Sequence, residues 1–356
     1  MIQAPHCPAK RAGFFLALML ILALLAEGSC AVALRIAEGK WPYSRQKNIN
    51  YQLFEPHPDW VVAPRKNISA IVRGHHHHHN RDGFRGAEFS RTTPRHRIAC
   101  VGGSTTYCIG VDDDDTWPHQ LHRLLQPEYE VLNFGIPGHS SVEHRKLLPM
   151  VLTRYAPEIV LLQLGLNDLR NMNVTDLGPD YCNFHQPSLY AASGFTRRDR
   201  LPRSALAQAA VVLLERTKIL PVYPFPHGFP AGEVSASVDP RVVEIFSANL
   251  DVMLRDCAAR QVRVVLLPHT MTRSLITEGS YKWWAPYLSK AGVFNALKAL
   301  NAVMQSKADG DRVTYAGFLE KETWDPSEFF DPSHLNAAGN ARLARLLKDG
   351  LPWSRP

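Results

Sequence analysis

The sequence predicts an α/β protein with a mainly parallel five-stranded sheet that helices cover on both faces. Short apolar runs of strand length alternate along the chain with longer runs of helical character. The first three apolar runs each end in a glycine-containing polar turn. The 356 residues, 45% hydrophobic and 21% charged, suit one such globular domain with an N-terminal extension. Strands that alternate with helices are typical of a parallel sheet, because each crossover places a helix on one face.

The expected elements follow in order along the chain. Apolar runs predict strands over 98–101, 129–134, 157–164, 262–267 and 313–318. Helices are expected over 119–125, 142–155, 241–260, 282–305 and 335–347. The four aspartates 112–115 are interpreted as a negatively charged helix start, favoured by the helix dipole, in preference to a Ca²⁺ site. Asn336 is expected to mark the start of the last helix, and Cys100 to be a small core residue.

An uninterrupted apolar run, Gly13 to Ala26, follows Lys10 and Arg11. Residues 1–36 are therefore expected to be either a cleaved signal peptide or a signal-anchor, and the uncleaved anchor is preferred. Because the basic residues precede the apolar run, both alternatives place the rest of the chain on the periplasmic or extracellular side. The membrane is thus an expected partner of this segment.

Residues 37–96 are expected to form an extended arm with little regular core that packs on the body. The histidine run His75 to His79 in this arm is interpreted as a solvated loop tip, with adventitious metal binding as the weaker alternative. The body is expected to be a single domain over 97–350. Its Pro-, Gly- and aromatic-rich part, 170–240, is interpreted as an irregular insertion near the rim of the active site.

Charge and cysteine content exclude several function classes. The net charge of +7 is concentrated in residues 1–97, which carry 14 Lys and Arg against 6 Asp and Glu. An enzyme that acts on nucleic acids would carry its positive charge around its cleft. Because the excess charge here lies in the N-terminal residues and not in the body, no nucleic-acid partner is expected. The six cysteines show neither a C-x-x-C pair nor a zinc spacing, so no metal is expected.

Polar residues follow three of the predicted strands and precede the last helix. Ser104 comes after Gly102 and Gly103, Gly138 ends the second polar turn, and Asn167 ends the third. The pair Asp331 and His334 precedes the final helix. Since ligands bind at the carboxyl ends of parallel strands, these groups are expected at one rim. A serine, an imidazole that takes its proton, a carboxylate that orients the imidazole, and oxyanion donors are what acyl transfer requires.

These residues resemble four sequence blocks of the SGNH (GDSL-like) hydrolases. The blocks read V-G-G-S-T-T, N-F-G-I-P-G-H-S-S, G-L-N-D and D-P-S-H-L-N, in the family order. The resemblance covers roughly residues 80–350. It departs from the common pattern at Gly103, where the eponymous motif has Asp, and at Leu166, where a second Gly is frequent.

The resemblance implies a flavodoxin-like three-layer α/β/α sandwich that uses no cofactor. Ser104 is the implied nucleophile, His334 its general base and Asp331 the orienting carboxylate. The implied oxyanion hole consists of the N–H groups of Ser104 and Gly138 and the side-chain amide of Asn167. Residues expected to support this site are Gly103, His139 and Asp168, the last interpreted as a structural turn-stabiliser.

The predicted function is a membrane-anchored or exported serine esterase that acts through an acyl-enzyme. Its expected partners are small-molecule or polymer-borne acyl esters, such as acetyl groups on a carbohydrate or cell-envelope polymer. An O-acyltransferase with the same triad, a lipase or a thioesterase are the alternatives of the same chemistry. A non-catalytic envelope-binding protein and a metal-dependent function of the histidine run are alternatives from other classes.

Overall fold

The computed structural model describes residues 8–39, 41–43, 52–89, 96–198, 200–201, 203–220, 232–282 and 284–353. The chain divides into two compact units. Unit 1 comprises residues 1–48 and 191–228, and unit 2 comprises residues 49–190 and 229–356. Residues 191–228, which lie within the predicted insertion, group with the N-terminal residues in unit 1.

Unit 2 is built on a sheet of five strands, all parallel. They are β5 (His96–Gly102), β6 (Tyr129–Gly135), β7 (Ile159–Gln163), β8 (Arg263–Leu266) and β9 (Val313–Tyr315). Their order across the sheet is β6-β5-β7-β8-β9. The predicted parallel five-stranded sheet is therefore confirmed, with the last strand ending earlier than expected.

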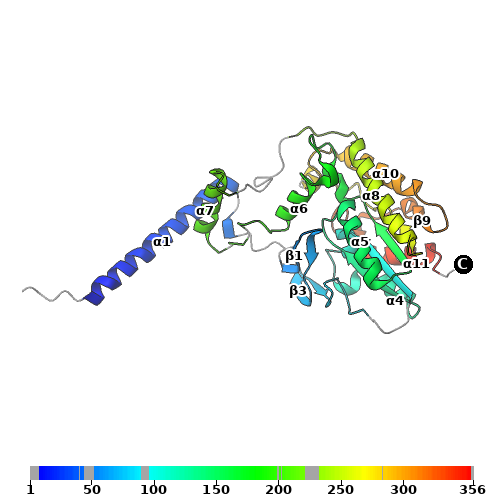
Figure 1. Cartoon of the computed structure of the whole chain (residues 1–356), viewed down its shortest axis with the longest axis horizontal. Coiled ribbons are helices and arrows are strands. Elements are labelled where there is room, and N and C mark those ends of the chain that lie inside the picture. The colour runs from blue at the N-terminus through cyan, green and yellow to red at the C-terminus, as the bar shows by residue number, and fades with distance from the viewer. Residues whose placement is uncertain are drawn as a thin grey trace, which may run out of the picture. The chain divides into compact units, whose positions relative to one another are not determined.

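Helices cover this sheet in two layers (Figure 1). Among the described residues, the α-helices assigned wholly or mostly to unit 2 are α3 (Ser104–Tyr107), α4 (Trp117–Leu125), α5 (Ser141–Tyr155), α6 (His185–Ala192), α8 (Pro240–Ala258), α9 (Glu278–Tyr281), α10 (Lys290–Ser306) and α11 (Ala337–Gly350). α4 packs against α11, whereas α5, α8 and α10 pack together. Short 3₁₀ helices are η2 (Asp113–Asp115), η3 (Asn167–Asn171), η4 (Pro179–Tyr181), η5 (Gly317–Lys321) and η6 (Pro326–Glu328).

Alternate residues of the central strands form the core beneath α4 and α11. One buried cluster contains Ile98 and Cys100 of β5, Ile159 and Leu161 of β7, Trp117 of α4 and Leu343 of α11. Cys100 is a fully buried core residue, as the sequence predicts. Because successive side chains of a strand point to opposite faces, the intervening residues face the other helical layer.

The helix predicted over 282–305 begins eight residues later than expected, as α10. Ser289 caps this helix, since its side chain accepts a hydrogen bond from the N–H of Gly292 at 3.1 Å. Pro286 lies just upstream, and proline disfavours helical backbone in the residue before it. The last helix begins directly after Asn336, whose side chain accepts from the N–H of Gly339 as predicted.

Two antiparallel hairpins precede the sheet where an arm with little regular core was expected. They pair β1 (Phe54–His57) with β2 (Val61–Pro64) and β3 (Ile68–Val72) with β4 (His75–His79). Leu53, Phe54 and Val62 are buried, so the arm does contribute a core. The arm is therefore more regular than the sequence suggests.

The prediction that the histidine run is a solvated loop tip is wrong. The run is strand β4, and the side chains of His77 and His79 are fully buried while His76 is exposed. A strand alternates its side chains between two faces, and a run of one residue type gives no hydrophobic alternation that would reveal this. Among the residues described, no cluster of three or more His, Cys, Asp or Glu is arranged to hold a metal ion.

Unit 1 contains the helices α1 (Pro8–Glu38) and α7 (Ala205–Arg216). Within α1, residues Ala12–Ala37 are long and apolar enough to cross a membrane, a test that a signal sequence also passes. Ala31 and Leu34 of α1 form a small buried cluster with Ala205 of α7. The predicted insertion thus contains a helix that packs on the N-terminal segment.

Candidate active site

Ser104 follows the carboxyl end of β5, which lies between β6 and β7 in the sheet, and is the first residue of α3. The two glycines before it are required by close contacts. A Cβ on Gly102 would lie 2.1 Å from Thr106 Oγ1, and a Cβ on Gly103 would lie 2.8 Å from Asn167 Nδ2. The Gly-Gly turn therefore lets Asn167 approach the chain next to Ser104.

A continuous chain of hydrogen bonds joins Ser104, His334 and Asp331. His334 Nε2 lies 2.7 Å from Ser104 Oγ, and His334 Nδ1 lies 2.8 Å from Asp331 Oδ2. Asp331 Oδ1 also accepts the backbone N–H groups of Ser333 and His334, at 2.9 Å each. Burial alone would raise the pKa of Asp331, but its bonds to the His334 ring and to these N–H groups lower it to about 2. Asp331 is therefore a carboxylate at neutral pH.

Two loops at the ends of β6 and β7 lie beside Gly103, the residue before Ser104. Gly138 adopts a left-handed backbone with φ of +84°, and Leu189 Cδ1 lies 2.3 Å from the place a Cβ would take. Glycine is thus needed at this position for two reasons. Asn167 opens η3, and its Nδ2 donates to the carbonyl of His139 at 2.9 Å. Since an amide NH₂ carries two donors, one N–H of Asn167 holds the two loops together and a second remains for another acceptor.

His139 and Asp168 hold these loops through hydrogen bonds to β2 and to the start of α5. His139 is buried, and burial lowers its pKa to about 3, so its ring is neutral. Its Nε2 lies 2.9 Å from the carbonyl of Val62 in β2. Asp168 accepts from the N–H of Ser141 at 3.0 Å and from its hydroxyl at 2.5 Å. Asp168 thus fixes the start of α5 to the Asn167 loop and makes no contact with the Ser104 chain of bonds.

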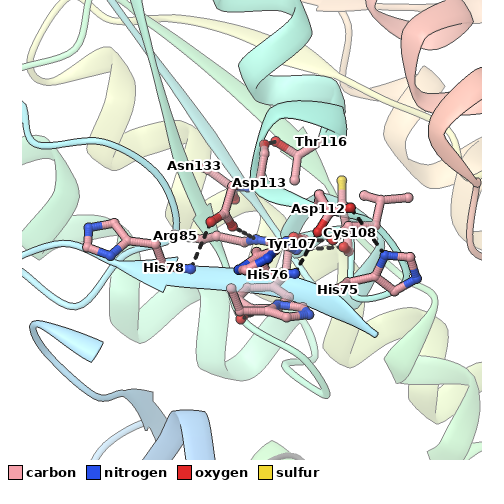
Figure 2. A network of polar contacts seen from close by, with 12 residues as sticks. His75, His76, His78, Arg85, Tyr107, Cys108, Asp112, Asp113, Thr116 and Asn133 are labelled. Atoms are coloured by element: carbon pink, nitrogen blue, oxygen red, sulfur yellow. Dashed lines mark hydrogen bonds and ion pairs between the residues drawn. The ribbon is translucent and has the colours of Figure 1, made fainter. Parts of the chain in front are cut away.

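Sequence reasoning missed Arg85, which fixes the far end of α3 (Figure 2). The Arg85 guanidinium is almost fully buried, and its NH1 donates to the carbonyls of Tyr107 at 2.8 Å and Cys108 at 2.6 Å. It also donates to the Val111 carbonyl and, through Nε, to Asp113 Oδ1, each at 2.6 Å. Arg85 lies in the glycine-containing stretch N-R-D-G-F-R-G, residues 80–86, which is the sequence signal that points to this segment.

Two histidines of β4 complete this network by contacting the Tyr107 hydroxyl. His77 Nδ1 lies 3.1 Å and His79 Nε2 2.9 Å from Tyr107 Oη. Because Ser104 begins α3 and Tyr107 ends it, contacts to Tyr107 restrain the helix that carries the serine. The buried part of the histidine run therefore has a structural role next to the candidate site.

The aspartates 112–115 lie at a helix start, as the sequence suggested, because Asp112 is the N-cap of the 3₁₀ helix η2 and the other three form its turn. Two of them also bind the backbone of β4. Asp112 Oδ1 accepts the N–H of His76 at 2.6 Å, and Asp113 Oδ2 accepts the N–H of His78 at 2.9 Å (Figure 2). The N-cap of α4 is Thr116. Two of the four carboxylates thus pair with the backbone of β4, which a local sequence pattern does not reveal because the partners are 35 and 36 residues apart.

Comparisons with known proteins agree with this architecture. Residues 100–342 match the GDSL-like Lipase/Acylhydrolase family. Over 93 residues the chain is 31% identical to Esterase TesA of Pseudomonas aeruginosa, a match that covers 25% of this chain and 46% of the relative, so it spans about half the length of that relative.

Solved structures of similar fold include a crystal structure of TesA and one of an acetyl xylan esterase. The first is 17% identical with a TM-score of 0.41 and covers 72% of this chain and 98% of its own. The second is 10% identical with a TM-score of 0.41 and covers 72% and 100%. The sequence match over 100–342 includes most of the chain and every residue of the Ser104–His334–Asp331 arrangement. The chain belongs to the GDSL-like Lipase/Acylhydrolase family of ester-bond hydrolases.

Proposed function

We propose that this chain is a serine esterase in which Ser104 is the nucleophile, His334 the general base and Asp331 the orienting carboxylate. The observation that carries the proposal is the unbroken chain of bonds from Ser104 Oγ through His334 to Asp331, with lengths of 2.7 and 2.8 Å. A serine hydroxyl is a weak nucleophile until such an imidazole accepts its proton. Unit 2 therefore contains the three groups that the proposed acyl transfer needs, which supports the proposal.

In the acylation step, Ser104 Oγ attacks the carbonyl carbon of the ester while His334 Nε2 takes the hydroxyl proton. The imidazolium then returns that proton to the alcohol oxygen as the carbon–oxygen bond to the alcohol breaks, which leaves an acyl group on Ser104. In deacylation, water gives a proton to His334 and attacks this acyl carbon, and the acid leaves as Ser104 recovers its proton. The Asp331 carboxylate stabilises the imidazolium in both steps.

The negative charge on the carbonyl oxygen needs donors that are already in place. We assign this role to the N–H groups of Ser104 and Gly138 and to the Asn167 side-chain amide. The left-handed backbone of Gly138 and the bond from Asn167 to His139 support the assignment, because both fix the donors before substrate binds. Gly103, His139 and Asp168 hold this arrangement without touching the substrate.

We further propose that the substrates are short acyl esters, acetyl first, carried by a carbohydrate or a cell-envelope polymer. Lys10 and Arg11 lie in the first turn of α1, ahead of its apolar span Ala12–Ala37, so we place unit 2 on the non-cytoplasmic side of a membrane that α1 anchors. An esterase at that place meets envelope polymers and not cytoplasmic thioesters.

The direct test compares the full chain with its Ser104→Ala variant on p-nitrophenyl esters of increasing acyl length. The proposal expects hydrolysis by the wild type, fastest with acetate, and a loss in kcat of about 10⁴-fold or more in the variant. Equal rates in two folded proteins would refute the role of Ser104. A maximum at long acyl chains would refute only the acyl-length assignment.

A further inference from the structure

Glu27 lies within α1, the helix proposed above as the membrane anchor. Its carboxylate accepts hydrogen bonds from groups at the start of α7. Glu27 Oε1 accepts the N–H of Ala205 at 2.5 Å, and Oε2 accepts the N–H of Leu206 and the hydroxyl of Ser204, both at 3.0 Å. The Tyr43 hydroxyl donates to Oε1 at 2.8 Å. A helix N-terminus stabilises a carboxylate, so this acidic residue is compensated inside unit 1.

The contact with α7 divides α1 into two parts. Beyond Glu27, Ala31 and Leu34 are buried on the α7 side, and α7 crosses the C-terminal end of α1 (Figure 1). Before Glu27, the apolar side chains between Phe14 and Leu25 are largely exposed. The uninterrupted apolar run before Glu27, 13–26, is about 21 Å long at ~1.5 Å per residue. This run alone is shorter than a hydrocarbon core of ~30 Å, although Val32 and Ile36 beyond Glu27 are exposed as well.

α7 carries an exposed apolar stripe on the face turned away from α1. Leu206, Ala210 and Leu213 are spaced as one helix face, and the two leucines are 45% and 62% exposed. The opposite face, with Ala205 and Gln208, is buried. Removing these leucine side chains from water would lower the free energy, so the stripe is suited to contact with an apolar environment outside unit 1.

Cationic and aromatic side chains flank this stripe. Arg200 and Arg203 precede α7, Arg216 and Lys218 end it, and all four are exposed. Trp41, which is 50% exposed, follows the end of α1. Basic residues beside an apolar helix face, with aromatic residues at the same level, are typical of the boundary between lipid headgroups and acyl chains.

We propose that α7 is an interfacial membrane helix, with Leu206 and Leu213 in contact with acyl chains and the flanking cations among the lipid phosphates. The inference rests on the proposed anchoring role of α1. The apolar face of an interfacial helix is buried about 5–10 Å into the boundary between headgroups and acyl chains. This depth, added to the length of the apolar run before Glu27, comes close to the ~30 Å thickness of the hydrocarbon core. The hydrogen bonds of Glu27 then connect the spanning helix α1 to the interfacial helix α7.

The test uses the full chain in vesicles of phosphatidylcholine and phosphatidylglycerol whose acyl chains carry bromine, a contact quencher of tryptophan fluorescence. Leu213→Trp probes α7, and Leu22→Trp probes α1. The signal of each added tryptophan is its difference from wild type, which removes the seven native tryptophans. Vesicles of unbrominated lipid give the unquenched reference for each variant.

The proposal expects strong quenching at position 22 and quenching at position 213 that is about half as strong or more, as befits a shallower site. Quenching at position 22 without quenching at 213 would overturn the interfacial role of α7 and retain the anchor. That result would assign the leucine stripe to a protein surface, such as a second copy of the chain. No quenching at either position would overturn the anchor and with it the role of α7.

Discussion

Asn167 is the residue on which the proposed oxyanion hole depends most. Its amide joins the loops after β6 and β7 through the His139 carbonyl and lies against Gly103. Replacing Asn167 with Ala removes one preorganised donor, so we expect kcat to fall about 10²–10³-fold while KM changes little. Steady-state kinetics on p-nitrophenyl acetate measure this. Asn295→Ala, at an exposed position of α10, is the matched control and should retain wild-type rates.

The candidate functional residues differ in how much the sequence reveals about them. Ser104, Asp331 and His334 are predictable because each lies beside a strand end or a helix start, and the family pattern gives their order. Arg85 is not predictable in this way, since most of its acceptors are backbone carbonyls, among them those 22, 23 and 26 residues away, and its carboxylate acceptor is 28 residues away. Backbone carbonyls carry no residue identity, so no pattern of side chains points to them.

At the scale of the element, α3 is a single helical turn that Arg85 and β4 hold at its end. We expect Arg85→Lys to lower kcat at least about tenfold with little change in KM, because a lysine cannot donate in the same fork to several acceptors. Arg81→Lys is the control, since Arg81 is exposed and pairs only at the surface with Glu88. A fall in thermal stability with kcat unchanged would show that Arg85 stabilises the fold without positioning Ser104.

Strand β4 also makes the stability of unit 2 depend on pH. Burial lowers the pKa of His79 to about 4, below the value near 6.5 of an unfolded histidine. The unfolded state therefore binds a proton first, and the stability contributed by neutral His79 is present above pH 6.5 and is lost as pH falls toward 4.

We expect His79→Gln to reduce this pH dependence. Glutamine reaches the Tyr107 hydroxyl much as Nε2 does, yet it does not titrate. Urea unfolding of both proteins between pH 7 and about 4.5 measures the slope of the unfolding free energy against pH. Identical slopes in the two proteins would show that His79 is not held neutral by the fold.

The elements were predictable to the extent that their signals are local. The five strands and the last helix follow from apolar runs and an N-cap that lie next to them in the sequence. The regular hairpin at His75 to His79 could not be predicted, because its burial arises from Tyr107 and the aspartates of a later segment. The partnership of α1 with α7 joins residues 178 positions apart, which no local pattern encodes.

At the scale of the whole molecule, the proposed orientation across a membrane depends on the two basic residues, Lys10 and Arg11, that precede the apolar span of α1. We expect Lys10→Glu combined with Arg11→Glu to decrease the fraction of chains whose unit 2 is on the non-cytoplasmic side. Protease added to the outside of sealed vesicles of known orientation reports this fraction. Arg73→Glu, in the exposed turn between β3 and β4, should leave it unchanged. An unchanged fraction in the double variant would contradict the proposed orientation.

The central claim is that Ser104 is a nucleophile activated by His334, and covalent labelling tests it most directly. A fluorophosphonate should react with the full chain at one equivalent, and peptide mass spectrometry should locate the adduct on Ser104. His334→Ala should slow this labelling by about 10³-fold or more. An adduct on another residue, or the same labelling rate in folded His334→Ala protein, would contradict the mechanism proposed for this site.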